Sequence, residues 1–304
     1  MHPRTALMCK HINKQSDMAN RDRPMKGKVC MVTGATSGLG QVTARVLAQR
    51  GATVIVMGRS LEKSTATVDQ IREKTRNAEV EFMIADLSVQ KDVRQLAQQF
   101  KNRYQRLDVL VNNAGAVSYK RQETIDGIEM TFAVNYLGHF LLTNLLLETL
   151  KASAPARIIN VSSGLHGRAK IDFDDLQSKK SYSGTGAYGR AKLAVVLFTY
   201  ELARRLEGTG VTVNVVNPGL VATKFGQEGS RVMGFMKRMV NVFAKSPEEG
   251  AQTTIYLATS PDAEKVTGKY FENQKAVESS EASYDEAVAR RLWQVSAELT
   301  GLKV

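Results

Sequence analysis

The chain has 304 residues, 43% of them hydrophobic, which suits one domain with elaborations rather than two domains. Its 42 lysine and arginine residues against 30 acidic residues give a net charge of +12, which can attract phosphates or anionic lipids. Clustered bases with interleaved aromatic residues are absent, so nucleic-acid binding is not expected. Two cysteines give no disulfide framework, and four scattered histidines predict no metal site. No apolar run reaches the roughly 18–20 residues that span a bilayer. We therefore expect a cytoplasmic protein.

The first 28 residues are polar, with seven lysines and arginines against two aspartates. They lack the apolar centre of a secretory signal. We therefore expect a flexible basic arm over residues 1–25, a folded domain over residues 26–275, and a C-terminal extension over residues 276–304.

A strand, a glycine-rich turn and a helix open the folded region. The apolar run over residues 29–33 leads into Gly34-Ala35-Thr36-Ser37-Gly38-Leu39-Gly40, and a helical pattern follows from Gln41 to Gln49. Backbone N–H groups and the positive end of a helix can cradle a phosphate there. Gly34 would make the tight turn, Gly38 would allow close backbone approach, and Gly40 would pack helix against strand. The spacing departs from the commoner Gly-x-Gly-x-x-Gly fingerprint, and an ordinary turn is the alternative, but the flanking elements favour dinucleotide binding.

Strand and helix patterns alternate through the rest of the domain. Apolar runs cover residues 52–57, 80–84, 109–111, 157–161 and 211–216, and helical patterns cover residues 61–75, 89–104, 132–150 and 188–206. Apolar strands separated by helices predict a doubly wound α/β domain with a parallel sheet. Its ligand should lie at the carboxyl ends of the strands, where the glycine turn and the loops at Asn112, Ser163 and Pro218 open.

Tyr188 and Lys192 lie four residues apart on the helical segment 188–206, so they share one helix face. A nearby cation favours the phenolate, and we expect Lys192 to lower the pKa of Tyr188. Making this phenol a base near neutral pH requires about 4 kcal/mol of differential stabilisation. Such a shift needs a partly dry site with further positive charge, which an oxidised nicotinamide could supply.

These features resemble the short-chain dehydrogenase/reductase family over about residues 26–275. The motifs fall in the family's order: Thr33-Gly34-x-x-x-Gly38-x-Gly40, Asp86-Leu87-Ser88, Asn112-Asn113-Ala114-Gly115, Asn135 in Val134-Asn135-Tyr136-Leu137-Gly138, Val161-Ser162-Ser163, Tyr188-x-x-x-Lys192 and Pro218-Gly219. Within the family, residues 160–163, 175–178 and 193–198 resemble the retinol-dehydrogenase-like branch. The resemblance implies a single Rossmann-type domain and an oxidoreductase that interconverts an alcohol and an aldehyde or ketone.

The resemblance also implies roles for the matched residues. Tyr188 would be the general acid/base, and Lys192 would lower its pKa and bind the nicotinamide ribose. Ser163 would hydrogen-bond the substrate oxygen and stabilise its developing charge. Ser162 is the competing candidate, but the separation of Ser163 from Tyr188 matches the retinol-dehydrogenase-like pattern, with an insertion over residues 172–183.

Two asparagines have a structural and a functional interpretation. Asn135 resembles the family's helix asparagine, which supports a water chain from Lys192 to solvent, and a helix-to-backbone hydrogen bond is a compatible alternative. Asn113 is predicted first as a strand-end stabiliser and second as a cofactor neighbour.

The choice of cofactor depends on the end of the second strand, Met57-Gly58-Arg59-Ser60. It lacks the acid that usually binds the NAD ribose, and Arg59 would complement a 2′-phosphate unless it is a plain surface arginine. Arg59 and the missing acid favour NADPH. Ser37 is neutral where some NADP-preferring relatives have a second cation, so use of NAD stays open. The residues expected around the cofactor, with Asp86 and Leu87 bordering the adenine, are Gly34, Thr36, Ser37, Gly38, Leu39, Gly40, Arg59, Asp86, Leu87, Asn113, Ala114, Gly115, Tyr188, Lys192, Pro218, Gly219 and Thr223.

Residues 223–246 have an apolar helical face bordered by bases and resemble the family's mobile substrate lid. A lid of this kind favours a lipophilic or retinoid-like substrate. Docking on the core or on a second subunit, and shallow contact with a membrane surface, are the alternatives. We also expect a homo-oligomer, a new helix starting near Ser246, and a final helix from about Tyr284 to Leu299, with no chemistry assigned to residues 276–304.

Two other functions fit the same motifs. The Tyr/Lys pair can also support reduction of a conjugated double bond. A dinucleotide-sensing or scaffold protein is the non-enzymatic alternative, which the presence of both Tyr188 and Lys192 disfavours.

Overall fold

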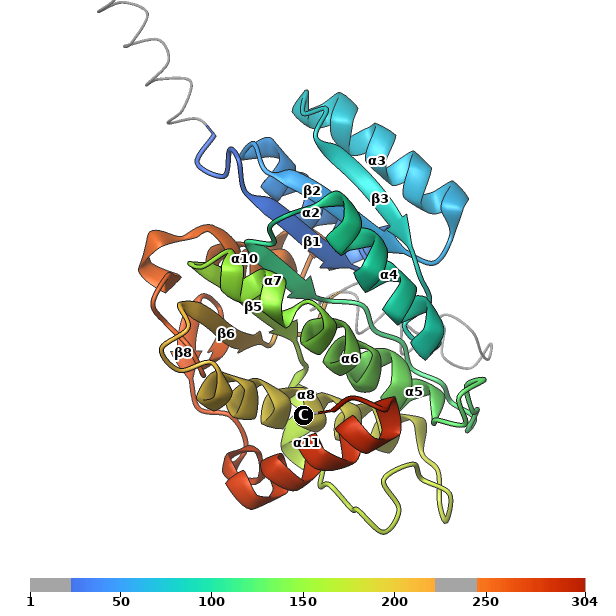
Figure 1. Ribbon diagram of the computed structural model, residues 1–304. Coiled ribbons are helices and arrows are strands. Elements are labelled where there is room, and N and C mark those ends of the chain that lie inside the picture. Colours follow the sequence, from blue (N-terminus) through green and yellow to red (C-terminus); the bar gives the residue numbers. More distant parts are fainter. Residues whose placement is uncertain (1–22, 222–244, 304) are drawn as a thin grey trace, which may run out of the picture.

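The computed structural model describes residues 23–221 and 245–303, and this part of the chain is built on one eight-stranded sheet with helices on both faces (Figure 1). The sheet has the order β3-β2-β1-β4-β5-β6-β7-β8. Its strands are β1 (Val29–Thr33), β2 (Thr53–Gly58), β3 (Val80–Ile84), β4 (Val109–Asn112), β5 (Ala156–Val161), β6 (Val211–Val216), β7 (Tyr270–Glu272) and β8 (Lys275–Val277). All neighbours from β3 to β7 pair in parallel, and only β8 is antiparallel to its neighbour. The predicted doubly wound α/β fold is therefore confirmed, with the reversal of strand order between β1 and β4.

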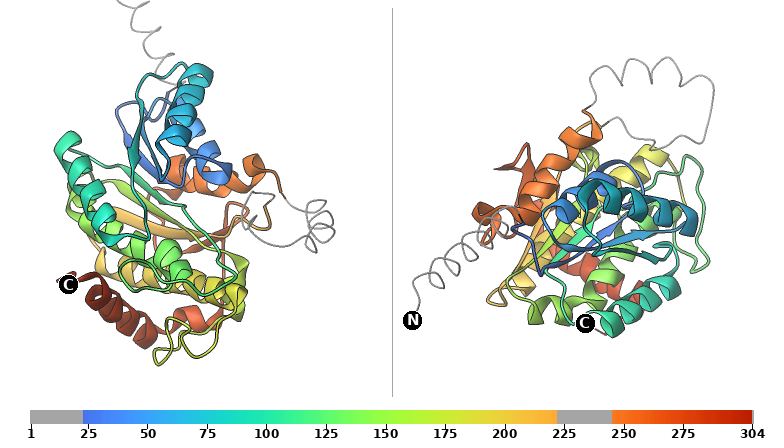
Figure 2. Two further views of the ribbon diagram at one scale, coloured as in Figure 1. Left: turned by 90° about the vertical axis from the view of Figure 1, so that its right-hand side faces the viewer. Right: turned by 90° about the horizontal axis from the view of Figure 1, so that it is seen from above.

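Helices form a layer on each side of the sheet (Figure 2). One side carries α2 (Gly38–Gln49), α3 (Leu61–Thr75) and α10 (Pro247–Thr259), which share one hydrophobic core with the sheet. The other side carries α4 (Gln90–Arg103), α6 (Gly138–Leu145), α7 (Leu147–Ala152) and α8 (Gly184–Arg205), with α11 (Glu286–Thr300) packed outside α8. Short helices complete the description: α5 (Met130–Phe132), the π-helical turn η1 (Ala133–Leu137), and the 3-10 turns η2 (Gly164–Arg168), η3 (Pro261–Ala263) and η4 (Glu281–Tyr284).

The single helix predicted over residues 132–150 is wrong in detail, because α5, η1, α6 and α7 divide this segment. A π-helical turn adds one residue to the helical repeat, and here it lies at Asn135. Gly138 follows it, and a Cβ there would collide with the Leu87 carbonyl oxygen. The segment therefore contacts the loop after β3 too closely for a side chain at residue 138.

Two further helices begin earlier than predicted. Helix α2 begins at Gly38 inside the glycine turn, and α8 begins at Gly184, where the Ser183 hydroxyl accepts from the Gly186 N–H. The predicted helix start at Ser246 is confirmed, because Ser246 and Glu249 form a reciprocal capping box before α10.

The C-terminal extension folds onto the domain. Trp293 of α11 lies with its ring 5.1 Å from that of Phe140 and 5.7 Å from that of Phe198. The Tyr136 hydroxyl lies 2.7 Å from the Ser296 hydroxyl. The final helix is thus part of the core on the α6 and α8 side, rather than a loose appendage.

The predicted basic arm over residues 1–25 and the predicted lid over residues 223–246, which includes Thr223, lie largely outside the described residues. Within residues 23–221 and 245–303, no helix is both long and apolar enough to cross a membrane.

Candidate active site

The glycine turn joins β1 to α2 and is held close to the loop after β4. Gly34 has a φ of 64°, and a Cβ there would lie 2.7 Å from the Ala114 Cα. A Cβ at residue 40 would lie 2.5 Å from the Gly34 carbonyl oxygen. The Ser37 side chain makes no capping hydrogen bond, and the first turn of α2 contains no acid. These features leave the positive end of α2 suited to an anionic phosphate, so the residues present fit a dinucleotide.

The loop after β4 is fastened to this turn by Asn113. Its Nδ2 donates to the Thr33 carbonyl oxygen at 2.8 Å and to that of Gly34 at 3.3 Å. In return, the Thr33 hydroxyl accepts from the N–H groups of Asn113 at 2.9 Å and Ala114 at 3.0 Å. Asn113 therefore makes the strand-end contact that was its first predicted role, and Gly115 follows in the same loop.

Arg59 and Asp86 lie together at the ends of β2 and β3. The Arg59 Nη1 is 3.7 Å from the Asp86 Oδ2, and the arginine side chain is 72% exposed. A Cβ at residue 58 would lie 2.7 Å from the Thr36 side chain, so the glycine turn packs directly against the residue before Arg59. Leu87 is buried beside them. Arg59 therefore directly follows a residue that packs against the glycine turn, and its guanidinium is exposed to solvent.

Tyr188 lies in the second turn of α8, and its phenol interacts with the Ser163 side chain after β5. Burial raises the pKa of Tyr188 to about 12, and the interaction with Ser163 acts in the opposite direction. The neighbouring Ser162 is committed elsewhere, because its hydroxyl donates to the Lys192 carbonyl oxygen at 2.9 Å. The geometry therefore places Ser163, rather than Ser162, with the tyrosine.

Lys192 is buried one helical turn after Tyr188. Its Nζ donates to the Val161 carbonyl oxygen at 2.9 Å and lies 5.5 Å from the centre of the Tyr188 ring. Burial lowers the pKa of Lys192 to about 7. Burial sets the direction of both pKa shifts, and the lowering of the Tyr188 pKa by Lys192 together with a bound nicotinamide stays a prediction.

Asn135 is fully buried in η1. Its Nδ2 donates to the Ala116 carbonyl oxygen at 2.6 Å and to that of Thr131 at 2.7 Å, while its Oδ1 is buried and has no hydrogen-bond partner among the described residues. The structure thus shows the helix-to-backbone bond, and the water chain stays a prediction. The Asn135 carbonyl oxygen lies 3.3 Å from the Nδ1 of His139.

Sequence reasoning missed two residues that support the site. His139 is buried, and its Nε2 lies 2.9 Å from the Thr33 hydroxyl, so it connects η1 to the glycine turn. Its position four residues after Asn135 is the helical spacing that could have suggested this. Asn217 accepts from the Gly219 N–H at 3.1 Å and shapes the Pro218-Gly219 turn, where Gly219 has a φ of 79°.

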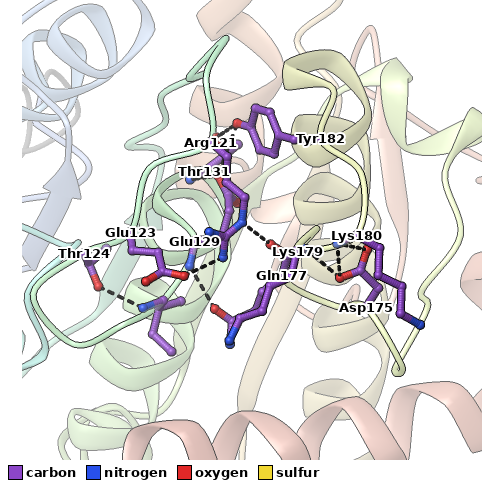
Figure 3. A network of polar contacts seen from close by, with 11 residues as sticks. Arg121, Glu123, Thr124, Glu129, Thr131, Asp175, Gln177, Lys179, Lys180 and Tyr182 are labelled. Atoms are coloured by element: carbon purple, nitrogen blue, oxygen red, sulfur yellow. Dashed lines mark hydrogen bonds and ion pairs between the residues drawn. The ribbon is translucent and has the colours of Figure 1, made fainter.

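A polar network joins the segment before η1 to the insertion before α8 (Figure 3). The Arg121 side chain bonds the Glu123 carboxylate at 2.7 Å and the Gln177 carbonyl oxygen at 3.1 Å, and the Tyr182 hydroxyl donates to the Ser118 carbonyl oxygen at 2.7 Å. The network anchors the insertion a few residues ahead of Tyr188. The chain before α8 is therefore held in place by contacts with residues that are distant in the sequence.

Comparisons with known proteins agree with this geometry. The family model described as short chain dehydrogenase matches residues 28–232. Human retinol dehydrogenase 14 is 46% identical over 295 residues, covering 91% of this chain and 88% of that protein. Human polyprenol dehydrogenase is 43% identical over 286 residues, covering 92% of this chain and 87% of that protein.

Solved structures show the same similarity. The crystal structure of an uncharacterized protein from Mycobacterium Paratuberculosis has a TM-score of 0.74 and 32% identity, covering 92% of this chain and 95% of that one. A short chain dehydrogenase from Burkholderia cenocepacia J2315 in complex with NADP has a TM-score of 0.65 and 26% identity, covering 81% of this chain and 96% of that one. The family-model match, the identity with the retinol dehydrogenases and the arrangement of Tyr188, Lys192 and the glycine turn agree. The chain belongs to the short-chain dehydrogenase/reductase family and is an NAD(P)-dependent oxidoreductase that interconverts alcohols with aldehydes or ketones.

Proposed function

We propose that the enzyme uses NADP(H) to interconvert a lipophilic, retinoid-like alcohol and its aldehyde or ketone, with Tyr188 as the proton donor and acceptor. The interaction of the Tyr188 phenol with the Ser163 side chain carries the proposal, together with the position of both residues near the glycine turn. Ser163 follows β5 and the glycine turn follows β1, so both lie at the carboxyl edge of the parallel sheet. A carbonyl oxygen placed between the two hydroxyls would face the cofactor cradle at the same edge.

The protein's residues then have distinct tasks in carbonyl reduction. When bound, the nicotinamide supplies the hydride to the substrate carbon. Tyr188 donates its phenolic proton to the substrate oxygen, and Ser163 stabilises the charge that develops on that oxygen. Lys192, in its protonated form, stabilises the phenolate that remains, and the Val161 carbonyl oxygen holds its Nζ in place. In alcohol oxidation the same proton returns to Tyr188.

The preference for the 2′-phosphate of NADP is supported by Arg59. Its guanidinium is exposed, lies at the end of β2 beside the glycine turn, and can bind a phosphate through paired N–H groups. Asp86 is the nearby carboxylate, 3.7 Å from Arg59, and an exposed pair at this distance is weak enough for a phosphate to replace. The Burkholderia relative in complex with NADP agrees with this choice.

The proposed lipophilic substrate is supported by the names of the relatives and by the surface near Ser163. The relatives include retinol dehydrogenases and a polyprenol dehydrogenase, whose names give retinol and polyprenol as their substrates. Leu165, two residues after Ser163, and Leu220, directly after Gly219, are large apolar side chains that remain exposed. Leu165 lies in η2 after β5 and Leu220 lies in the loop after β6, so both are at the carboxyl edge of the sheet, where they could contact an apolar chain.

The test is a series of straight-chain aldehydes of increasing length together with all-trans-retinal, followed by the loss of NADPH absorbance. Each CH₂ that becomes buried contributes about 0.8 kcal/mol, so kcat/KM should rise about fourfold per buried carbon before it levels off. Tyr188→Phe, assayed in parallel, separates enzymatic turnover from background oxidation. A kcat/KM that does not change with chain length would contradict the lipophilic substrate, and turnover retained by Tyr188→Phe would contradict the mechanism.

A further inference from the structure

A second buried histidine, His166, lies three residues after Ser163 in η2. Its Nδ1 is 2.8 Å from the Ser163 carbonyl oxygen, and its Nε2 is 3.2 Å from the backbone N–H of Ser280. A carbonyl oxygen only accepts and a backbone N–H only donates, so a neutral imidazole protonated at Nδ1 satisfies both contacts at once. Burial lowers the pKa of His166, which favours this neutral form near neutral pH.

The imidazole also faces the turn that ends at Gly219. Its ring centre lies 5.0 Å from that of Tyr270 on β7. Phe271, next to Tyr270 on β7, accepts from the Asn217 N–H at 2.9 Å, and the Asn217 side chain in turn accepts from the Gly219 N–H at 3.1 Å. His166 is therefore packed between the Ser163 turn and the residues that shape the Pro218-Gly219 loop.

The other partner of His166, Ser280, belongs to a well-fastened part of the C-terminal extension. The adjacent Ser279 hydroxyl lies 2.7 Å from the Tyr200 hydroxyl of α8, and the Ser279 N–H donates to the Tyr284 hydroxyl at 3.0 Å. The rings of Tyr200 and Tyr284 stack with their centres 5.4 Å apart. The backbone at Ser280 is thus a fixed point, anchored on the same helix that carries Tyr188.

We propose that His166 is a positioning residue that fixes the Ser163 backbone against the C-terminal extension and so keeps the Ser163 hydroxyl in place beside Tyr188. The inference rests on the proposed function of Ser163 and Tyr188. It gives the extension a task in the reaction, because Ser280 supplies the hydrogen bond that orients the imidazole. A displacement of about 1 Å in a catalytic group can reduce turnover about a hundredfold, so a small shift of this turn has a large effect.

Two isosteric variants separate the two contacts of the imidazole. His166→Asn places an amide near the position of Nδ1, so it keeps a donor for the Ser163 carbonyl oxygen but does not reach Ser280. His166→Gln places its amide near the position of Nε2, so it keeps an acceptor for Ser280 but loses the donor to Ser163. His166→Leu removes both. We expect kcat to fall about tenfold to a hundredfold in the Leu and Gln variants, to recover partly in the Asn variant, and the Kd for NADPH to stay within about twofold.

Ser280→Pro tests the link to the extension without changing the histidine. Ser280 has a φ of −67°, which proline adopts, and the substitution removes the N–H that His166 accepts from. We expect kcat to fall severalfold. Ser296→Ala is the control, because Ser296 is buried in α11 of the same extension and its hydroxyl bonds the Tyr136 hydroxyl and the Leu292 carbonyl oxygen, each at 2.7 Å, rather than Ser280. It should lower Tm while kcat stays within about twofold.

Three results would overturn the proposal: wild-type kcat in folded His166→Leu, wild-type kcat in Ser280→Pro, or an equal loss in Ser296→Ala. A long-range ¹H–¹⁵N spectrum of the unmutated protein gives an independent readout and should show His166 protonated at Nδ1, whereas protonation at Nε2 would refute the assignment. Tyr188→Phe in the same assay distinguishes this failure from that of the proposed function, because full activity there would refute the role of Tyr188 whatever the His166 variants do.

Discussion

The fit of the glycine turn against its neighbours can be tested by Gly40→Ala. A Cβ at residue 40 would lie 2.5 Å from the Gly34 carbonyl oxygen and 2.5 Å from the Asn113 Nδ2. The first of these atoms is backbone, so the turn must move to admit the methyl group. Overpacking of this kind costs about 1–3 kcal/mol of unfolding free energy. The movement also displaces the N–H groups at the start of α2, so we expect the Kd for NADPH to rise at least about tenfold, or about 1.4 kcal/mol.

Gly186→Ala is the matched control for this substitution. Gly186 lies in α8, where an added Cβ would be 3.5 Å from the Ser183 Cβ, an ordinary contact. Because alanine is the better helix former by up to about 1 kcal/mol, this variant should be at least as stable as the wild type and should bind NADPH unchanged. Urea denaturation measures the stabilities, and a fluorescence titration with NADPH measures the affinities. A Gly40→Ala variant with wild-type midpoint and wild-type Kd would refute the close packing of the turn.

Three further substitutions test the acid/base residue Tyr188, the cofactor preference set by Arg59 and the buried His139. Tyr188→Phe should lose at least about a hundredfold in kcat while the Kd for NADPH changes little, as steady-state kinetics and titration will show. Arg59→Asp should lower the ratio of kcat/KM for NADPH over NADH at least about tenfold, and an unchanged ratio would mean that the preference is set elsewhere. Burial lowers the pKa of His139 to about 3 from its ordinary 6.5, so the unfolded chain binds a proton that the folded chain excludes. The stability due to this group is complete above about pH 6.5 and should fall by up to about 1.4 kcal/mol per pH unit toward pH 3, a slope that denaturation of His139→Gln should lack.

The strands and the glycine turn could be predicted because their signals are local. The run over residues 29–33 is apolar without interruption, and the glycines that follow it mark the turn at Gly34 and Gly40. The break in the helix predicted over residues 132–150 could not be predicted in this way. It depends on the contact of Gly138 with the loop at Leu87, which lies far away in the sequence.

The site residues show the same difference between local sequence signals and contacts between distant residues. Tyr188 and Lys192 were found from their helical spacing, but their pKa values depend on burial, which spacing does not reveal. The bond between His166 and Ser280 joins residues 114 positions apart, so no local pattern indicates it. The homo-oligomer and the cytoplasmic location stay predictions.

The position of α11 after α6 and α8 in the sequence has a consequence for the order in which the protein folds. The rings of Phe140 and Phe198 are covered by Trp293, which is synthesised 95 residues after Phe198 (293 − 198 = 95). During synthesis, the apolar face of α6 and α8 therefore stays exposed until α11 has been made and packs on it. Exposed faces of this kind bind chaperones or aggregate. A chain that stops before residue 286 would leave that face uncovered, so a stop codon ahead of α11 should yield insoluble protein rather than a shortened enzyme.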